Sequence, residues 1–136
     1  MKQVFLDSGA FFALLVAEDA FHKRAVTLFQ LANAENWILV TTNLVVVETY
    51  APILARTRNG RNNAVAFLDS LGASECRVER VTENDEAVGT EIIRTQQDKT
   101  YSLCDAISFA VMKRMAITEV ISFDKHFREF GQFVVL

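Results

Sequence analysis

The chain has 136 residues, 51% of them hydrophobic, and a formal net charge of −3, which predicts a single domain spanning residues 1–136 around one core. A mildly acidic chain is no general nucleic-acid binder, because that role needs a positive field over a large surface. Asp7 interrupts the first apolar run, which argues against a secretory signal, and the longest apolar run (10–17) is too short to cross a bilayer. Cys76 and Cys104 match no disulfide framework or zinc spacing. We therefore expect a reduced, cytoplasmic protein.

Short apolar runs alternate with amphipathic segments along the chain. In chain order we expect a strand at 3–6, helices at 8–16 and 20–33, a strand at 37–40, a helix at 43–58 capped by Asn43, a polar turn at 58–63, a helix at 64–71 ending at Gly72, a strand at 76–81, helices at 83–97 and 102–115, and strands at 119–122 and 132–135. This alternation predicts an α/β fold with a mostly parallel central sheet. In such sheets the functional site lies at the carboxyl ends of the strands.

Four carboxylates follow the predicted strands. Asp7 and Asp124 each come directly after a strand, so both should lie on the same edge of the sheet. Glu48 lies one turn into the helix after strand 37–40, and Asp105 lies in the first turn of helix 102–115. The four side chains are therefore expected to converge.

Simple structural roles compete with this interpretation. Asp7 and Asp124 could be helix N-caps, and Asp105 stands three residues after Ser102, the spacing of a capping box. Glu48 is harder to explain in this way. Its helix is apolar nearly all round, which predicts burial, and no Lys or Arg stands one turn away to neutralise the carboxylate.

Converging carboxylates repel one another, so the cluster should need a cation. Hard ions such as Mg²⁺ or Mn²⁺ prefer all-oxygen sites, whereas no Cys or His stands among the four positions to favour zinc. Mg²⁺ held by carboxylates and water is a common device for phosphodiester chemistry, because the ion activates a water and neutralises the phosphate.

Four stretches together resemble the PIN-domain ribonucleases, and most of all the VapC-type toxins of type II toxin–antitoxin pairs: VFLDSGAFFALL, TTNLVVVET, SLCDAISFAVMKRM and VISFDKHF. The resemblance covers essentially the whole chain. It implies a three-layer α/β/α fold, endonucleolytic cleavage of RNA that depends on Mg²⁺ or Mn²⁺, a homodimer, and an antitoxin partner that blocks the site. Carried over by motif, the catalytic metal ligands are Asp7, Glu48, Asp105 and Asp124.

Two positions depart from the family pattern. Ser122 and Cys104 stand where the family commonly has Thr. Ser122 keeps a hydroxyl that could hold water or the substrate phosphate, and Cys104 keeps no good donor. Ser8 is expected either to hydrogen-bond a ligand carboxylate or the scissile phosphate, or to cap a helix. Asp98 is either a fifth acid or a solvated loop residue, and the second interpretation is favoured.

Several further residues have two interpretations each. His126 could touch substrate, but an incidental exposed histidine is favoured. Arg56, Arg58 and Arg61 could hold RNA phosphates or simply form a solvated helix end. Of the aromatic residues, Phe109 and Phe123 are expected in the core. Phe11, Phe12, Phe21 and Phe29 are expected in the core or in an antitoxin or dimer groove rather than in a base-stacking platform.

Two other functions compete with the nuclease interpretation. A phosphatase using Asp7 as nucleophile usually needs a second Asp two positions later, where this chain has Gly9. A catalytically silent PIN-like module that only binds RNA or a partner is the main alternative, and the loss of an acid would favour it; all four are present.

Overall fold

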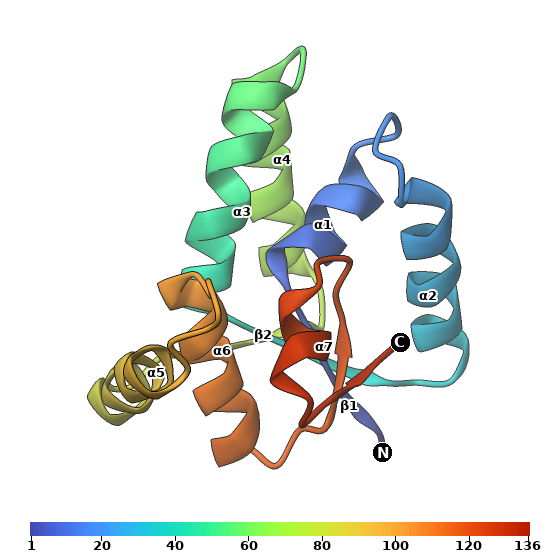
Figure 1. Ribbon diagram of the computed structural model, residues 1–136. Helices are drawn as coiled ribbons and strands as arrows, with labels where there is room; N and C mark the ends of the chain where they lie inside the picture. The colour runs from blue at the N-terminus through green and yellow to red at the C-terminus, as the bar shows by residue number, and fades with distance from the viewer.

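The centre of the molecule is a five-stranded sheet with the order β3-β2-β1-β4-β5 (Figure 1). The structure is a computed structural model that describes residues 1–136. Every neighbouring pair of strands runs parallel, which confirms the predicted α/β fold. The strands are β1 (Gln3–Leu6), β2 (Ile38–Thr42), β3 (Arg77–Glu79), β4 (Glu119–Ile121) and β5 (Val134–Val135). The strand order reverses at β1, so the carboxyl ends of β1 and β4 flank the switch point at which parallel sheets bind ligands.

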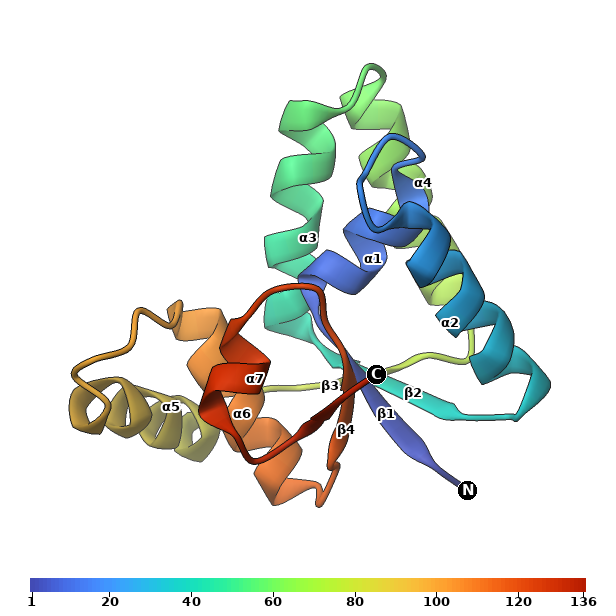
Figure 2. The same cartoon turned by 45° about the vertical axis from the view of Figure 1, so that its right-hand side comes forward.

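Seven helices surround the sheet: α1 (Ser8–Leu15), α2 (His22–Ala34), α3 (Asn43–Arg56), α4 (Gly60–Ala73), α5 (Glu83–Thr95), α6 (Leu103–Arg114) and α7 (His126–Phe130). Figure 2 shows the strands between α5, α6 and α7 on one side and α1 and α2 on the other. Helices α3 and α4 pack against each other and form a hairpin that stands away from the sheet. This is the three-layer arrangement that the resemblance implies. None of the helices is both long and apolar enough to span a bilayer.

Alternating side chains of β1 reach the two helical layers. Phe5 is fully buried and its ring centroid lies 6.5 Å from that of Phe127 in α7. The next residue, Leu6, faces the opposite layer and lines a groove with Phe11 of α1 and Phe67 of α4, as the period of two of a strand requires. Both faces belong to one cluster of 21 buried apolar residues, which explains why the strands read as continuous apolar runs.

Helix α6, which carries Asp105 at its start, is braced by α5. A Cβ added to Gly89 would lie 2.8 Å from a side-chain carbon of Ile107, so only glycine lets the two helices come this close. At the other end of α6, Arg114 makes two hydrogen bonds of 2.9 Å to the buried carboxylate of Asp85. These bonds to Arg114 are the main reason that the pKa of Asp85 is lowered. The brace fixes the position of α6, and with it the position of Asp105.

We expect Arg114→Met to lower the free energy of unfolding by about 2 kcal/mol, because the buried Asp85 carboxylate loses its two charge-assisted hydrogen bonds. The matched control is Arg94→Met on α5, whose ion pair with Glu91 is exposed and is expected to contribute less than about 0.5 kcal/mol. Urea denaturation of the two variants measures the difference. Equal losses would show that the brace contributes no more than a surface ion pair.

Most element boundaries differ from the sequence expectation by a few residues, and the list of expected elements lacked helix α7; three further differences concern a cap or a turn. Thr42, not Asn43, caps α3, because the Thr42 hydroxyl accepts the Val45 N–H; the Asn43 side chain instead accepts the Val81 N–H, 2.9 Å away. Helix α3 ends at Arg56, and α4 begins at Gly60, so most of the expected turn is helical. Helix α4 also runs through the expected C-cap Gly72 and ends at Ala73.

Two expectations about burial were wrong. Helix α3 is buried along one face only, and Val47 is 68% exposed, because the α3–α4 hairpin leaves the sheet. Phe109 is fully buried as expected, but Phe123 is only partly buried and packs at the margin of the core.

Candidate metal and active site

The four predicted acids converge at the carboxyl edge of the sheet, as the positions of the strands required. Carboxylate oxygens of Asp7, Glu48 and Asp105 all lie within 4.8 Å of one another. A second group with the same spacing joins Asp105, Asp124 and a nitrogen of His126. Asp105 belongs to both groups and therefore links them into one cluster.

Asp7 is the most buried of the four acids and is only 2% exposed. It occupies the N-cap position of α1, but its side chain makes no capping hydrogen bond; one carboxylate oxygen instead accepts the hydroxyl of Ser122 at 3.0 Å. Burial raises the pKa of Asp7 well above its usual value, and the nearby charges of Asp124 and Asp105 raise it further. A capping role therefore does not explain Asp7, and its ionised form needs a compensating positive charge.

Asp105 caps its helix and also lies among the other acids. It forms a capping box with Ser102, whose hydroxyl accepts the Asp105 N–H at 3.0 Å. The same carboxylate lies 2.8 Å from Nδ1 of His126. Burial, followed by the charge of Asp124, raises the pKa of Asp105. The capping box holds this carboxylate at the start of α6, facing the other acids.

Glu48 lies in the cluster, as its position after β2 predicted, but the expectation of a buried carboxylate without a partner was wrong. The side chain is partly exposed, and it is not without a partner, because the hydroxyl of Ser8 donates to its Oε1 at 2.7 Å. Of the alternatives for Ser8, the hydrogen bond to an acidic side chain is thus present. Burial and the adjacent Glu48 carboxylate raise the pKa of Cys104, so the thiol stays protonated beside the acids.

His126 is the residue that sequence reasoning undervalued. Besides the Nδ1 contact to Asp105, its backbone N–H donates to Asp124 Oδ1 at 2.8 Å, and Nδ1 lies 4.0 Å from the same carboxylate. One residue therefore contacts two of the acids, and an imidazole nitrogen does lie among the candidate ligands, contrary to expectation. The signal was available in the Asp-Lys-His spacing at 124–126.

Replacing His126 tests whether it positions the Asp105 carboxylate. We expect His126→Ala to weaken Mn²⁺ binding by about 10-fold to 100-fold, which is the usual cost of losing a group that orients a metal ligand. His126→Asn should recover part of the affinity, because its amide can donate from a position close to Nδ1. Titration calorimetry with Mn²⁺ measures both variants; unchanged affinity in His126→Ala would show that the contact to Asp105 orients nothing.

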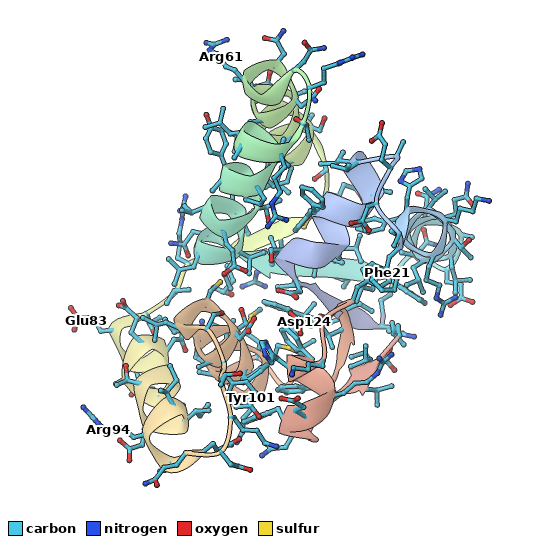
Figure 3. The ribbon with its side chains drawn as sticks, turned by 45° about the horizontal axis from the view of Figure 1, so that its top comes forward. Phe21, Arg61, Glu83, Arg94, Tyr101 and Asp124 are labelled. Carbon is cyan, nitrogen blue, oxygen red and sulfur yellow. The ribbon has the colours of Figure 1, made fainter.

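The predicted arginines do not lie in this cluster. Arg56, Arg58 and Arg61 are exposed at the tip of the α3–α4 hairpin, and Figure 3 shows Arg61 far from Asp124. Eight residues of helix separate Glu48 from Arg56, a rise of about 12 Å. Asp98 is also outside the cluster: its side chain is 80% exposed and lies 3.6 Å from Lys99 Nζ, in agreement with the favoured loop interpretation.

The chemistry of the cluster fits a hard divalent cation. Carboxylate oxygens dominate the donor set, two of the acids have raised pKa values because burial and like charges oppose their ionisation, and no Lys or Arg forms an ion pair with them. A bound cation would offset the repulsion and restore the charged carboxylates. Mg²⁺ and Mn²⁺ both suit this donor set, and the single imidazole nitrogen suits Mn²⁺ better than Mg²⁺.

Comparison with known proteins connects this site to a family. The PIN domain family matches residues 4–132. The 23S rRNA-specific endonuclease VapC20 of Mycobacterium tuberculosis is 33% identical over 128 residues, which cover 94% of each chain. The crystal structure of Mycobacterium tuberculosis VapC20, described as a Sarcin-Ricin loop cleaving toxin, matches with a TM-score of 0.89 and 32% identity over 98% of both chains.

Two more distant structures show the same fold. VapBC2 from Rickettsia felis, bound to a DNA fragment from its promoter, matches with a TM-score of 0.73 and 12% identity, covering 98% of this chain and 97% of the other. FitAcB from Neisseria gonorrhoeae matches with a TM-score of 0.70 and 18% identity over 98% and 96%.

Proposed function

This chain belongs to the PIN-domain family, as a VapC-type ribonuclease toxin, and we propose that it cuts RNA with Mg²⁺ or Mn²⁺ held by Asp7, Glu48, Asp105 and Asp124. The observation that carries this assignment is the convergence of carboxylates around the buried Asp7. When bound, the ion would supply an activated water and positive charge for the phosphodiester. The alternative of a catalytically silent module is disfavoured because none of the four acids is missing.

The protein's own residues hold and orient this donor set. Ser122 fixes the Asp7 carboxylate through its hydrogen bond, and Ser8 does the same for Glu48. The capping box at Ser102 and the His126 contact restrict Asp105 from two sides. Because each acid is held before any ion binds, the ion meets a pre-oriented site and little reorganisation is needed.

We propose ribosomal RNA as the substrate to test first, since the VapC20 relative is a 23S rRNA-specific endonuclease. The exposed Arg56, Arg58 and Arg61 at the hairpin tip are proposed to bind phosphates of such a large RNA at a distance from the cut bond. They lie outside the acidic cluster, so their loss should weaken RNA binding and leave metal binding unchanged.

An apolar groove among α1, α2, α4 and the neighbouring strands is the proposed site of an antitoxin segment. It encloses about 950 Å³, and 14 of its 19 lining residues are hydrophobic, among them Phe11, Phe29 and Phe67. VapBC complexes occur among the structural relatives, which supports such a partner. We also propose that the chain acts as one domain and works in the cytoplasm, as its length, apolar runs and cysteines suggest, and that it forms a homodimer, as the family resemblance implies.

The experiment is cleavage of purified ribosomal RNA by the purified chain, freed of any bound partner, with Mg²⁺, with Mn²⁺ and with a chelator. Cleavage is expected with either ion and should stop in the chelator. In parallel, Mn²⁺ should raise the thermal midpoint, because an ion that binds only the folded state stabilises it. A Mn²⁺ shift without cleavage of any RNA would favour a silent binding module, and the absence of both would refute the metal site.

A further inference from the structure

An exposed aromatic side chain stands beside the acidic cluster. Phe21, in the loop between α1 and α2, is 48% exposed. Its ring stacks on Phe123 with the centroids 5.0 Å apart and the planes only 5° from parallel. Phe123 is the residue immediately before Asp124. Figure 3 shows Phe21 and Asp124 in the same part of the molecule.

The stack leaves one face of Phe21 free. Its inner face is covered by Phe123, so the large exposed fraction belongs to the outer face and the ring edge. The backbone that carries the ring is held: the Phe21 N–H donates to Asp19 Oδ2 at 2.9 Å, and Nδ1 of the adjacent His22 lies 2.8 Å from the Ala13 carbonyl oxygen. A held aromatic face beside a phosphodiester-cleaving centre has the geometry of a stacking platform for a base.

Charged side chains of both signs lie near Phe21 and Asp124 along the chain. Lys23 and Arg24 follow Phe21 and are exposed, and Lys125 follows Asp124 with its side chain 73% exposed. Lys125 pairs with Glu129 at 3.8 Å, and Glu18 and Asp19 precede Phe21, so Lys23 and Arg24 are the cations here that form no ion pair. Cations around an exposed aromatic ring are the usual composition of a single-strand RNA contact.

Phe21 is separate from the groove assigned to the antitoxin. Neither Phe21 nor Phe123 lines that groove, which lies among α1, α2, α4 and the neighbouring strands. The sequence had grouped Phe21 with Phe11 and Phe29, which do line it. The structure therefore separates these residues: Phe11 and Phe29 line the apolar groove, and Phe21 is an exposed ring near the acids.

We propose that the outer face of Phe21 stacks on one unpaired base of the RNA, in a nucleotide flanking the bond that is cut. The inference rests on the proposed function for the location of that bond. Stacking on the ring needs the base to be out of a helix, so Phe21 favours loops and single strands over duplexes. Because every base has a π-face, the contact selects unpaired structure more than sequence.

The test uses cleavage-deficient protein, carrying Asp7→Asn, and an eight-nucleotide single-stranded RNA with 2-aminopurine at successive positions. Binding should quench 2-aminopurine fluorescence at one position with Phe21 and with Phe21→Trp. In Phe21→Leu the quenching should disappear and the dissociation constant should rise by about 5-fold to 100-fold. Leucine keeps an apolar contact with Phe123, so the folded state is preserved, and the thermal midpoint checks this.

The matched control is Leu31→Ala, which removes an exposed apolar side chain (40% exposed) elsewhere on α2 and should leave RNA binding unchanged. Mn²⁺ affinity should be equal in all Phe21 variants, because Phe21 holds no ion. Equal RNA affinity of the Phe21→Leu variant and of the protein that keeps Phe21 would overturn the proposal. A Phe21→Leu variant that loses only antitoxin binding would overturn it as well. If wild-type protein binds RNA through Phe21 but cleaves none, the stacking site survives and the proposed nuclease fails.

Discussion

Asp105→Asn and Asp7→Asn are each expected to lower the rate of RNA cleavage by more than about 100-fold. Loss of a group that merely orients a metal ligand costs about 10-fold to 100-fold, so loss of a ligand charge should cost at least the upper end of that range. The amide keeps the shape of the carboxylate but removes its charge. Single-turnover cleavage of ribosomal RNA at saturating Mn²⁺ measures the loss, and Asp98→Asn, which removes the same charge from an exposed loop, serves as the matched control.

The same variants should be more stable than the wild type when no ion is present. Asp7 and Asp105 are buried beside other carboxylates, and removing one negative charge relieves that repulsion. An inactive variant with a higher melting temperature in chelator cannot owe its inactivity to misfolding. Cleavage at the wild-type rate in Asp7→Asn and Asp105→Asn would show that neither acid is a metal ligand.

The sequence predicted the position of the site better than its internal contacts. Asp7 and Asp124 could be located because a parallel sheet brings its strand ends to one edge, a rule that depends only on the order of the elements. The contact between His126 and Asp105 joins residues 21 positions apart and depends on how α7 packs against α6. No periodicity in the sequence reports such a packing angle.

Errors in the helices have a similar origin. Glu48 was placed in the cluster by its position one turn into the helix after β2. A purely structural role was dismissed because that helix was expected to be buried on all sides, whereas α3 leaves the sheet and exposes Val47. The expected turn at 58–63 contains the start of α4 because Gly60 lies directly against the end of α3, where any Cβ would meet the Leu54 carbonyl oxygen. Local composition favoured a turn, and close packing between two helices decided where the turn ended.

Stability in the absence of an ion should fall as the pH rises above 3.8 and through the raised pKa values of Asp7 and Asp105. The folded protein holds a proton on Asp7 and on Asp105 more tightly than the unfolded chain does, because burial raises both pKa values above the usual 3.8. Stability therefore decreases as the pH passes from that value upward through the raised pKa values. Asp85 acts in the opposite sense: its lowered pKa gives stability that is present above 3.8 and is lost as the pH falls through the folded value.

Bound Mn²⁺ should cancel this loss of stability at higher pH, because metal binding needs the charged carboxylates that higher pH supplies. At an ion concentration about 100 times the dissociation constant, the expected stabilisation is about 2.7 kcal/mol. Urea denaturation across the pH range, in chelator and in Mn²⁺, gives both curves, and Asp7→Asn should flatten the chelator curve alone. A stability that rises towards neutral pH in chelator would contradict the link between the raised pKa values and stability. If the curves of stability against pH coincide with and without Mn²⁺, a cation does not relieve the repulsion among these acids.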